Sequence, residues 1–407
     1  MRGRILVAAL AASLAFSASA QIAPFQSKFD QALTEHGIVG GGFAFVHGSD
    51  APVEHAFGRQ RVDGPKIDAE TAYNWASITK TFTAIAILQL RDHGKLTLDD
   101  PATTWLPELR QVHDAYGPVD AITIRQLLSH SAGFRNPTWP WDCDDAESCD
   151  WQPFEPTRWA QLAAMLPYTH VAFKPGSRWS YSNPAYVFLG QIIERLSGDD
   201  FEVYVDKNIL KPLEMTRSYF DQAPYFLEPH LSASYLRAGP KLTPQPFNYD
   251  TGLTTSNSGL KAPIADMVKY LRFLIGDARN PLYDVVLKRA SLREMWTGLI
   301  KIEETGPAAT VYTAGAPMMG MGFFTATLHG RAYVYHDGDQ AGFSSELIVD
   351  PAGRSAAILA VNTTDTGDLP AADALHAQSN TDPDPQTDLR RALRAMLVDE
   401  VFPHYAK

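Results

Sequence analysis

Short apolar runs typical of strands lie near both ends of this chain, and helical patterns fill its middle. Gly40 to Val46 and Val53 to Phe57 are such runs near the N-terminus. Those near the C-terminus are Met319 to Phe324, Ala332 to Tyr335, Glu346 to Val349 and Ala356 to Val361. Strands that are distant in the sequence must therefore join in one antiparallel sheet. The predicted fold class is α/β of the α+β type.

Amphipathic patterns predict a helix at each end of the chain, Phe25 to His36 and Asp388 to Phe402, which are expected to flank the sheet. The helices in between are expected to form an all-helical lobe over about residues 76–309. The sheet lobe is then expected to comprise about residues 21–75 and 310–407. A pocket is expected in the cleft between the two lobes.

The N-terminus has the three parts of a secretory signal: positive charge, an apolar run too short to span a bilayer, and a small-residue cleavage site. These parts are Arg2 and Arg4, Ile5 to Phe16, and Ala18-Ser-Ala20 before Gln21. We expect residues 1–20 to be a signal peptide and residues 21–407 to form one exported domain, periplasmic or secreted. A buried N-terminal helix is the alternative. No other stretch is long and apolar enough to cross a membrane.

The charge of the chain bears on its partners. The formal net charge of the 407 residues is −11. Nucleic-acid binding needs a basic face, so we expect no nucleic-acid partner. The acidic residues are dispersed along the chain, which favours a role in solubility over one in recognition.

Two segments are expected to be loops: residues 221–250, which hold five prolines, and residues 136–151, which hold three tryptophans and the only two cysteines. Export favours a local disulfide between Cys143 and Cys149, and free thiols are the alternative. A zinc site would need four ligands, and no histidine lies nearby. The tryptophans either form the rim of a binding site or fill the core beneath a packed loop.

A serine and a lysine stand three residues apart at the start of a predicted helix. Apolar residues recur at helical spacing from Lys80 to Leu90, and Gly94 is a natural stop. Ser77 is therefore expected in the first turn, with Lys80 on the same face. A serine needs a base to take its proton, and burial lowers the pKa of a lysine, so that the amine can be that base. A second Ser-x-x-Lys, Ser258 to Lys261, is interpreted as chance.

Two further motifs fit the same chemistry: Tyr181-Ser-Asn183 before a predicted helix and His336-Asp-Gly338 at the end of a predicted strand. Together with Ser77-Ile-Thr-Lys80 they resemble the three motifs of the serine β-lactamase and penicillin-binding-protein superfamily, above all its class C branch and the related esterases and D-amino-acid peptidases. Further matches in consistent order are Leu127 to Gly133, Pro175-Gly176, Tyr181 to Gly190, Ser258-Gly-Leu, Ala265-Asp-Met267 and Gly342 to Ser345. The resemblance covers about residues 25–365 and implies a β-lactamase/transpeptidase-like fold.

The resemblance implies three catalytic residues. Ser77 would attack a carbonyl carbon and form an acyl-enzyme. Lys80 would either hold a low pKa itself or lower that of Tyr181 through its charge. Tyr181 would move protons between the serine and the leaving group.

The resemblance also implies the residues that bind the substrate. Asn183 would bond a substrate amide and help to hold the catalytic lysine. His336 and Gly338 would line the cleft on the sheet side. The backbone N–H groups of Asp339 and of the nucleophile would form the oxyanion hole.

Two features depart from the commonest pattern of the superfamily. His336 stands where many members have lysine, and an uncharged imidazole would grip a substrate carboxylate less well, which favours ester or amide hydrolysis over efficient β-lactam hydrolysis. Asp337 and Asp339 would either repel anionic substrates or point away along the strand. A metal site at these three residues lacks a second histidine at ligand spacing. His130 is expected to have a structural polar role at the end of a short helix, because no motif pairs with it.

The sequence therefore predicts an exported serine acyl-hydrolase with a β-lactamase-like fold and an acyl-enzyme on Ser77. Its substrate would be a small-molecule or peptide acyl compound, namely an ester, a β-lactam or a D-amino-acid peptide. We expect no cofactor and no metal, and the sequence does not predict an oligomeric state. The alternative is a non-catalytic protein that uses the same cleft to bind peptidoglycan fragments or acyl ligands.

Overall fold

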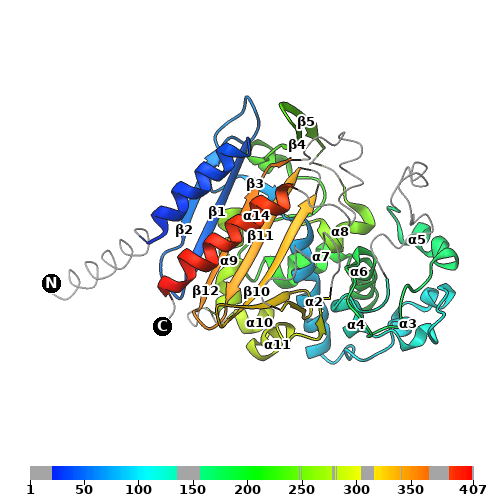
Figure 1. Ribbon diagram of the computed structural model, residues 1–407. Helices are drawn as coiled ribbons and strands as arrows, with labels where there is room; N and C mark the ends of the chain where they lie inside the picture. Colours follow the sequence, from blue (N-terminus) through cyan, green and yellow to red (C-terminus); the bar gives the residue numbers. More distant parts are fainter. Residues whose placement is uncertain are drawn as a thin grey trace.

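The computed structural model describes residues 21–134, 156–246, 248, 250–276, 280, 282–303, 316–340, 342–365 and 385–405. Its centre is an eight-stranded sheet whose neighbouring strands are antiparallel (Figure 1). The strand order is β2 (Val53–Gly58), β1 (Gly40–His47), β12 (Ser355–Val361), β11 (Phe343–Asp350), β10 (Arg331–Gln340), β9 (Phe324–Leu328), β8 (Met318–Met319) and β7 (Ile300–Lys301). Strand β1 pairs with β12, with Phe43 opposite Leu359. The predicted joining of distant strands in one sheet is confirmed.

Alternation along the strands gives the sheet two buried faces. Phe43 and Phe45 belong to one apolar cluster, whereas Ala44 and Val46, which alternate with them, belong to another. Successive side chains of a strand point to opposite faces, so each cluster marks one face of the sheet. We call the face of Phe43 the outer face and the face of Ala44 the inner face.

Two terminal helices cover the outer face (Figure 1). The N-terminal one spans residues 21–35, and its Phe25 and Phe29 rings lie 4.8 and 5.1 Å from the ring of Phe43. The other is α14 (Pro385–Met396), which continues into a π-helical turn (Leu397–Val401). Both helices were predicted to flank the sheet, and both predictions are confirmed.

The remaining helices lie on the inner face and beyond it. The longest buried one is α2 (Thr79–Asp92), in which every residue from Thr79 to Leu90 is buried. Since no face of α2 is left to solvent, the helix forms the centre of the inner-face core. The others are α3 (Ala102–Trp105), α4 (Ile124–Leu128), α5 (Trp159–Met165), α6 (Asn183–Ser197), α7 (Phe201–Val205), α8 (Thr255–Ser258), α9 (Ile264–Ile275), α10 (Tyr283–Val286) and α11 (Arg289–Met295).

Two strand predictions were wrong in detail. Residues 221–250 are not all irregular, because β4 (Ser234–Ala238) and β5 (Lys241–Gln245) form a hairpin whose β4 pairs with β13 (Thr363–Asp365). The proline in β5 is tolerated because β5 is an edge strand. The run from Met319 to Phe324 is not one strand, because a turn at Gly320 and Gly322 separates β8 from β9. A short ladder, β3 (Ala72–Asn74) with β6 (Lys261–Pro263), lies apart from the main sheet.

Some predictions fall on residues that the structure does not describe. The signal peptide over residues 1–20 and the loop with Cys143 and Cys149 lie outside the described residues. Within the described part of the chain, no helix is both long enough and apolar enough to span a bilayer.

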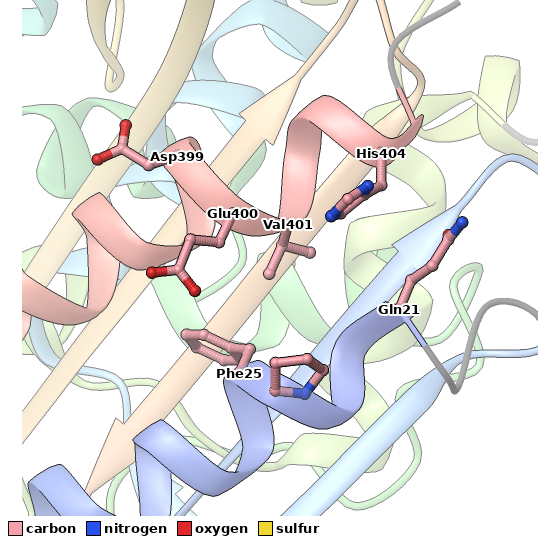
Figure 2. Close-up of a pocket in the computed structure, with 7 residues that line it drawn as sticks. Gln21, Phe25, Asp399, Glu400, Val401 and His404 are labelled. Carbon is pink, nitrogen blue, oxygen red and sulfur yellow. The ribbon is translucent and has the colours of Figure 1, made fainter.

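A surface pocket of about 360 Å³ lies between the two terminal segments (Figure 2). Its lining includes Gln21 and Phe25 of the N-terminal helix and Asp399, Val401 and His404 of the C-terminal segment. Phe25 and Val401 belong to the outer-face cluster, so this pocket lies across the sheet from α2 and includes none of the predicted site residues.

Candidate active site

The predicted nucleophile, Ser77, lies on a strained turn between a short strand and α2, which we call the nucleophile turn. Ser77 is in a 3₁₀ turn, η1 (Ala76–Ile78), and not in the first turn of the helix as predicted. Ala76 holds a left-handed φ of 46°, a conformation that costs an alanine on the order of 1–2 kcal/mol. The side chain of Asn74 stabilises it, because Oδ1 accepts a hydrogen bond of 2.8 Å from the Ala76 N–H. Ser77 is partly exposed while residues 71–76 before it and 78–80 after it are buried, so the turn presents the hydroxyl at the surface.

Lys80 lies in the first turn of α2 and its amine meets the Ser77 hydroxyl. Nζ donates hydrogen bonds of 3.0 Å to Ser77 Oγ and of 3.0 Å to the backbone carbonyl of Asn257. The side chain is 0% exposed. Burial lowers the pKa of Lys80 far below its ordinary value, against the opposing charge of Asp337. The amine is therefore suited to act as a neutral base.

Tyr181 reaches the same place from the segment before α6. The ring of Tyr181 stacks on that of His130, with centroids 4.5 Å apart, and Lys80 Nζ lies 5.0 Å from the Tyr181 ring centroid. Burial raises the pKa of the Tyr181 phenol, and hydrogen bonding with Ser77 offsets part of the rise. The phenol stays protonated at neutral pH. Of the two predicted alternatives, the directions of these shifts favour a low pKa on Lys80 itself.

His130 is tied to the start of α6. Its Nδ1 accepts a 3.1 Å hydrogen bond from the backbone N–H of Ser182, which is the N-cap residue of that helix. Burial lowers the pKa of His130, and repulsion from the protonated forms of Lys80 and His336 lowers it further. A neutral imidazole whose Nδ1 accepts must carry its proton on Nε2. The structural role predicted for His130 is therefore specific: it orients Tyr181 and caps the segment that carries it.

Asn183 does not hold Lys80 as predicted. It is the first residue of α6, and its buried Oδ1 has no hydrogen-bond partner among the described residues. Besides Ser77 Oγ, the Lys80 amine donates to the backbone carbonyl of Asn257, near the end of α8. A main-chain carbonyl can accept a hydrogen bond from the lysine whatever side chain the residue carries, and α8 brings the carbonyl of Asn257 within reach.

The third motif lies inside β10 and not at its end. His336 Nδ1 lies 2.6 Å from the carbonyl oxygen of Asp337, and because a carbonyl only accepts, Nδ1 carries the proton. Burial lowers the pKa of His336 to about 4, so the imidazole is neutral at pH 7. Its Nε2 then bears a lone pair, and within the described residues this buried atom has no partner.

Gly338 lets β10 pass against the nucleophile turn. A Cβ at this position would lie 2.4 Å from the carbonyl oxygen of Trp75 and 2.6 Å from Ser345 Oγ, closer than any side chain permits. Ser345 Oγ donates to that same carbonyl at 3.3 Å. The strand is therefore in contact with the turn one residue before Asp339, whose N–H is a predicted oxyanion donor.

The two acids of β10 are both paired with one arginine. Arg390 of α14 lies 2.9 Å from Asp337 and forms a second ion pair with Asp339. This arrangement answers the question that the sequence left open, since the carboxylates are engaged on the outer face. No group of three or more His, Cys, Asp or Glu residues in the described ranges is arranged to hold a metal ion.

Three residues of this site were missed in the sequence. Asn74 supports the turn at Ala76, and Asn257 contributes only its main-chain carbonyl. Neither role produces a recognisable sequence motif. Arg390 lies on a helix that the pattern predicted to be amphipathic, where a cation is ordinarily solvated. The only sequence evidence for such an arginine was the pair of acids on β10, because acids on a covered strand need a cationic partner.

Comparison with known proteins identifies the family. A model of the Beta-lactamase family matches residues 25–381. The chain belongs to the Beta-lactamase family. The predicted superfamily is therefore confirmed. The predicted fold is confirmed by a solved structure, the octameric penicillin-binding protein homologue from Pyrococcus abyssi. It superposes with a TM-score of 0.71 at 26% identity, and the match covers 92% of this chain and 81% of that one.

Two curated relatives are similar over shorter stretches. Protein flp of Staphylococcus aureus (strain COL) is 26% identical over 317 residues, which are 77% of this chain and 57% of flp. Esterase EstB of Burkholderia gladioli is 32% identical over 215 residues, 50% of this chain and 52% of EstB. The chain thus spans little more than half the length of either relative.

Proposed function

We propose that this chain is an exported serine acyl-hydrolase that cleaves neutral carboxylic esters through an acyl-enzyme on Ser77. The observation that carries the proposal is the fully buried Lys80 amine, 3.0 Å from the Ser77 hydroxyl and with a lowered pKa. A neutral amine at this distance can take the hydroxyl proton as the oxygen attacks.

The reaction runs in two halves. Ser77 Oγ forms a bond to the ester carbonyl carbon while its proton passes to Lys80 Nζ, and the carbonyl oxygen gains negative charge. The N–H groups of Ser77 and Asp339 stabilise that charge. The C–O bond to the leaving group then breaks, and the Tyr181 phenol supplies the alcohol with a proton that Lys80 replaces. Water attacks the acyl-enzyme in the same manner and restores the serine.

The proposed preference for neutral esters rests on the charges around the third motif. His336 is uncharged at pH 7 because burial lowers its pKa to about 4. The cation nearest to the acids of β10, Arg390, is already paired with both of them. A substrate carboxylate would thus lack a fixed positive charge on this side, whereas an uncharged ester needs none. The esterase named among the relatives supports the same substrate class.

Covalent labelling tests the nucleophile. The purified protein is treated with an alkyl phosphonate probe and its intact mass is measured. We expect one adduct on the wild type, none on Ser77→Ala, and full labelling of Ser258→Ala, which removes the serine of the second Ser-x-x-Lys. If no such probe labels the wild type, the non-catalytic ligand-binding alternative is favoured.

Rates on three substrates test the substrate class. Hydrolysis of a chromogenic short-chain ester, a chromogenic cephalosporin and a D-alanyl peptide is compared at one pH, with Ser77→Ala as the blank. The ester should give the highest kcat/KM. Faster cleavage of the cephalosporin would contradict the ester proposal without removing the acyl-enzyme.

Export is a separate part of the proposal and depends on residues 1–20 alone. The charge, apolar run and cleavage site of this segment support removal before Gln21. Mass spectrometry of the protein recovered from the periplasm or medium of an expressing bacterium should find a chain that begins at Gln21. A full-length chain in the cytoplasm would refute export.

A further inference from the structure

A cluster of charges, buried or nearly so except for the partly exposed Asp339, lies on the outer face of the sheet, directly behind the third motif. Its cations are Arg390 and Arg394, one helical turn apart on α14, with side chains 5% and 13% exposed. Its anions are Asp337, Asp339 and Glu346 on β10 and β11. Helix α14 lies along this face of the sheet, in contact with β11 (Figure 1). Buried charges at this density are stable only when each one is paired.

A single guanidinium holds both acids that flank Gly338. Arg390 Nη2 lies 2.9 Å from Asp337 Oδ2, while Nη1 pairs with the Asp339 carboxylate and donates to Ser344 Oγ at 3.1 Å. The planar guanidinium of arginine can donate hydrogen bonds to two carboxylates at once in fixed directions, whereas a lysine ammonium does not fix these directions. Arg390 therefore holds β10 at two residues, Asp337 and Asp339, one on each side of Gly338.

The strand connects this cluster to the reacting atoms. Side chains alternate along β10, so Asp337 and Asp339 face α14 while His336 and Gly338 face the nucleophile turn. The Cα atoms of these two acids are about 7 Å apart along the strand, and carboxylates that share one guanidinium repel each other when it is removed. Asp339 also carries the backbone N–H that the proposed oxyanion hole uses, so its carboxylate lies near the negative charge of the transition state.

We propose that Arg390 is a positioning residue for acyl transfer, which holds the oxyanion-hole segment of β10 in place and cancels the negative charge of Asp337 and Asp339. This role rests on the proposed acyl-enzyme function of Ser77. Arg390 acts from the far side of the sheet and touches no reacting atom. Without it, the buried carboxylate of Asp337 and the partly exposed one of Asp339 oppose the charge that develops on the substrate oxygen, and the segment loses its tie to α14.

Arg394 provides a matched control on the same helix. It pairs with Glu346 at 2.7 Å and lies 4.5 Å from the ring centroid of Tyr335. Burial raises the pKa of Glu346 to about 7, so this acid can take up a proton when its partner is removed. Loss of Arg394 therefore leaves less uncompensated charge than loss of Arg390, and it leaves the tie to Asp339 intact.

The test measures kcat, KM and thermal unfolding on a neutral ester for four variants. Arg390→Met should lower kcat by about 10²-fold, the size expected for a small misplacement of catalytic groups, with little change in KM. Arg394→Met, which loses similar packing, should keep kcat within about threefold. Arg390→Lys, which keeps the charge but not the fork, should lie between the wild type and Arg390→Met. Adding Asp337→Asn and Asp339→Asn to Arg390→Met should restore kcat by about tenfold or more, because the acids are then neutral.

The outcomes separate this role from simple packing. If Arg390→Met keeps wild-type kcat, or if the triple variant folds and recovers nothing, Arg390 has no charge-dependent role in positioning. If Arg390→Met does not fold, the triple variant decides by the same criterion. A wild type that hydrolyses no ester and takes no phosphonate label overturns the proposed function itself, and this role with it. An active wild type with an equally active Arg390→Met overturns only the role of Arg390.

Discussion

Asn74 links the nucleophile turn to the sheet, because its Nδ2 donates a 3.2 Å hydrogen bond to the side-chain oxygen of Gln340 at the end of β10. The other end of the same amide accepts from the N–H of Ala76. One side chain thus spans the gap between Ser77 and the strand that carries the predicted oxyanion donor. Together with the close approach of Gly338 to the Trp75 carbonyl, this amide sets the distance between the two parts of the site.

Replacement of Asn74 should therefore impair catalysis more than folding. Asn74→Ala leaves the buried N–H of Ala76 without its acceptor, at a cost of about 1–3 kcal/mol, and releases the turn from β10. We expect kcat to fall by about 10²-fold through misplacement of Ser77, while the protein still unfolds cooperatively on heating. Gln340→Ala, which removes only the second bond, should have a smaller effect. Wild-type kcat in Asn74→Ala would show that the turn needs no support from this amide.

The acid side of the pH–rate profile should report Lys80. The amine acts as a base only when it is deprotonated, and burial lowers its pKa far below the ordinary value. The ester kcat/KM should thus rise with pH and level off well before the pH at which a solvated lysine loses its proton. Lys80→Ala should fold, lose about 10³-fold in acylation rate and lose this rise. Near-normal turnover in Lys80→Ala would remove the lysine from the mechanism.

The sequence predicted those parts of the site that depend on local geometry. Ser77 and Lys80 meet because residues three apart lie on the same side of the 3₁₀ turn that leads into α2, and strands β1 and β12 were recognisable from their apolar runs. Contacts through the main chain were not predictable, as with the Asn257 carbonyl that holds the lysine. The hairpin of β4 and β5 was missed because its prolines suggested a loop, although an edge strand accepts proline.

The partners of the two acids on β10 depend on tertiary packing. The sequence left open whether Asp337 and Asp339 repel substrates or point away, since strand alternation alone does not say which face is covered. That face is covered by α14, which supplies Arg390. The pairing follows from where a helix docks about fifty residues later, and no local pattern records it.

A fixed cation at the third motif should change which substrates the site accepts. His336→Lys places an amine where the imidazole is neutral, and a charged hydrogen bond to a substrate carboxylate contributes about 1.5–3 kcal/mol. We expect KM for an ester that carries a carboxylate beside the scissile bond to fall by about tenfold or more. KM for the matched methyl ester should change little. His336→Gln, which adds no charge, serves as control. An equal change of KM for both esters would mean that charge at this position does not select substrates.

Acid should destabilise the fold through His336. In the folded state burial lowers its pKa to about 4, whereas in the unfolded chain the imidazole titrates near 6.5. Between these two pH values the unfolded chain binds the proton and the folded chain does not, so the free energy of unfolding falls as the pH falls. The loss attributable to His336 should approach ~3 kcal/mol near pH 4.

Glu346 has the opposite effect on stability, because its pKa is raised to about 7 and the folded state gains a proton there as the pH falls. The contribution of His336 is therefore measured as a difference: denaturant unfolding of the wild type and of His336→Gln is compared from pH 7.5 to pH 4. The wild type should lose stability relative to the variant as the pH falls, and a constant difference would show that His336 has the same pKa in both states.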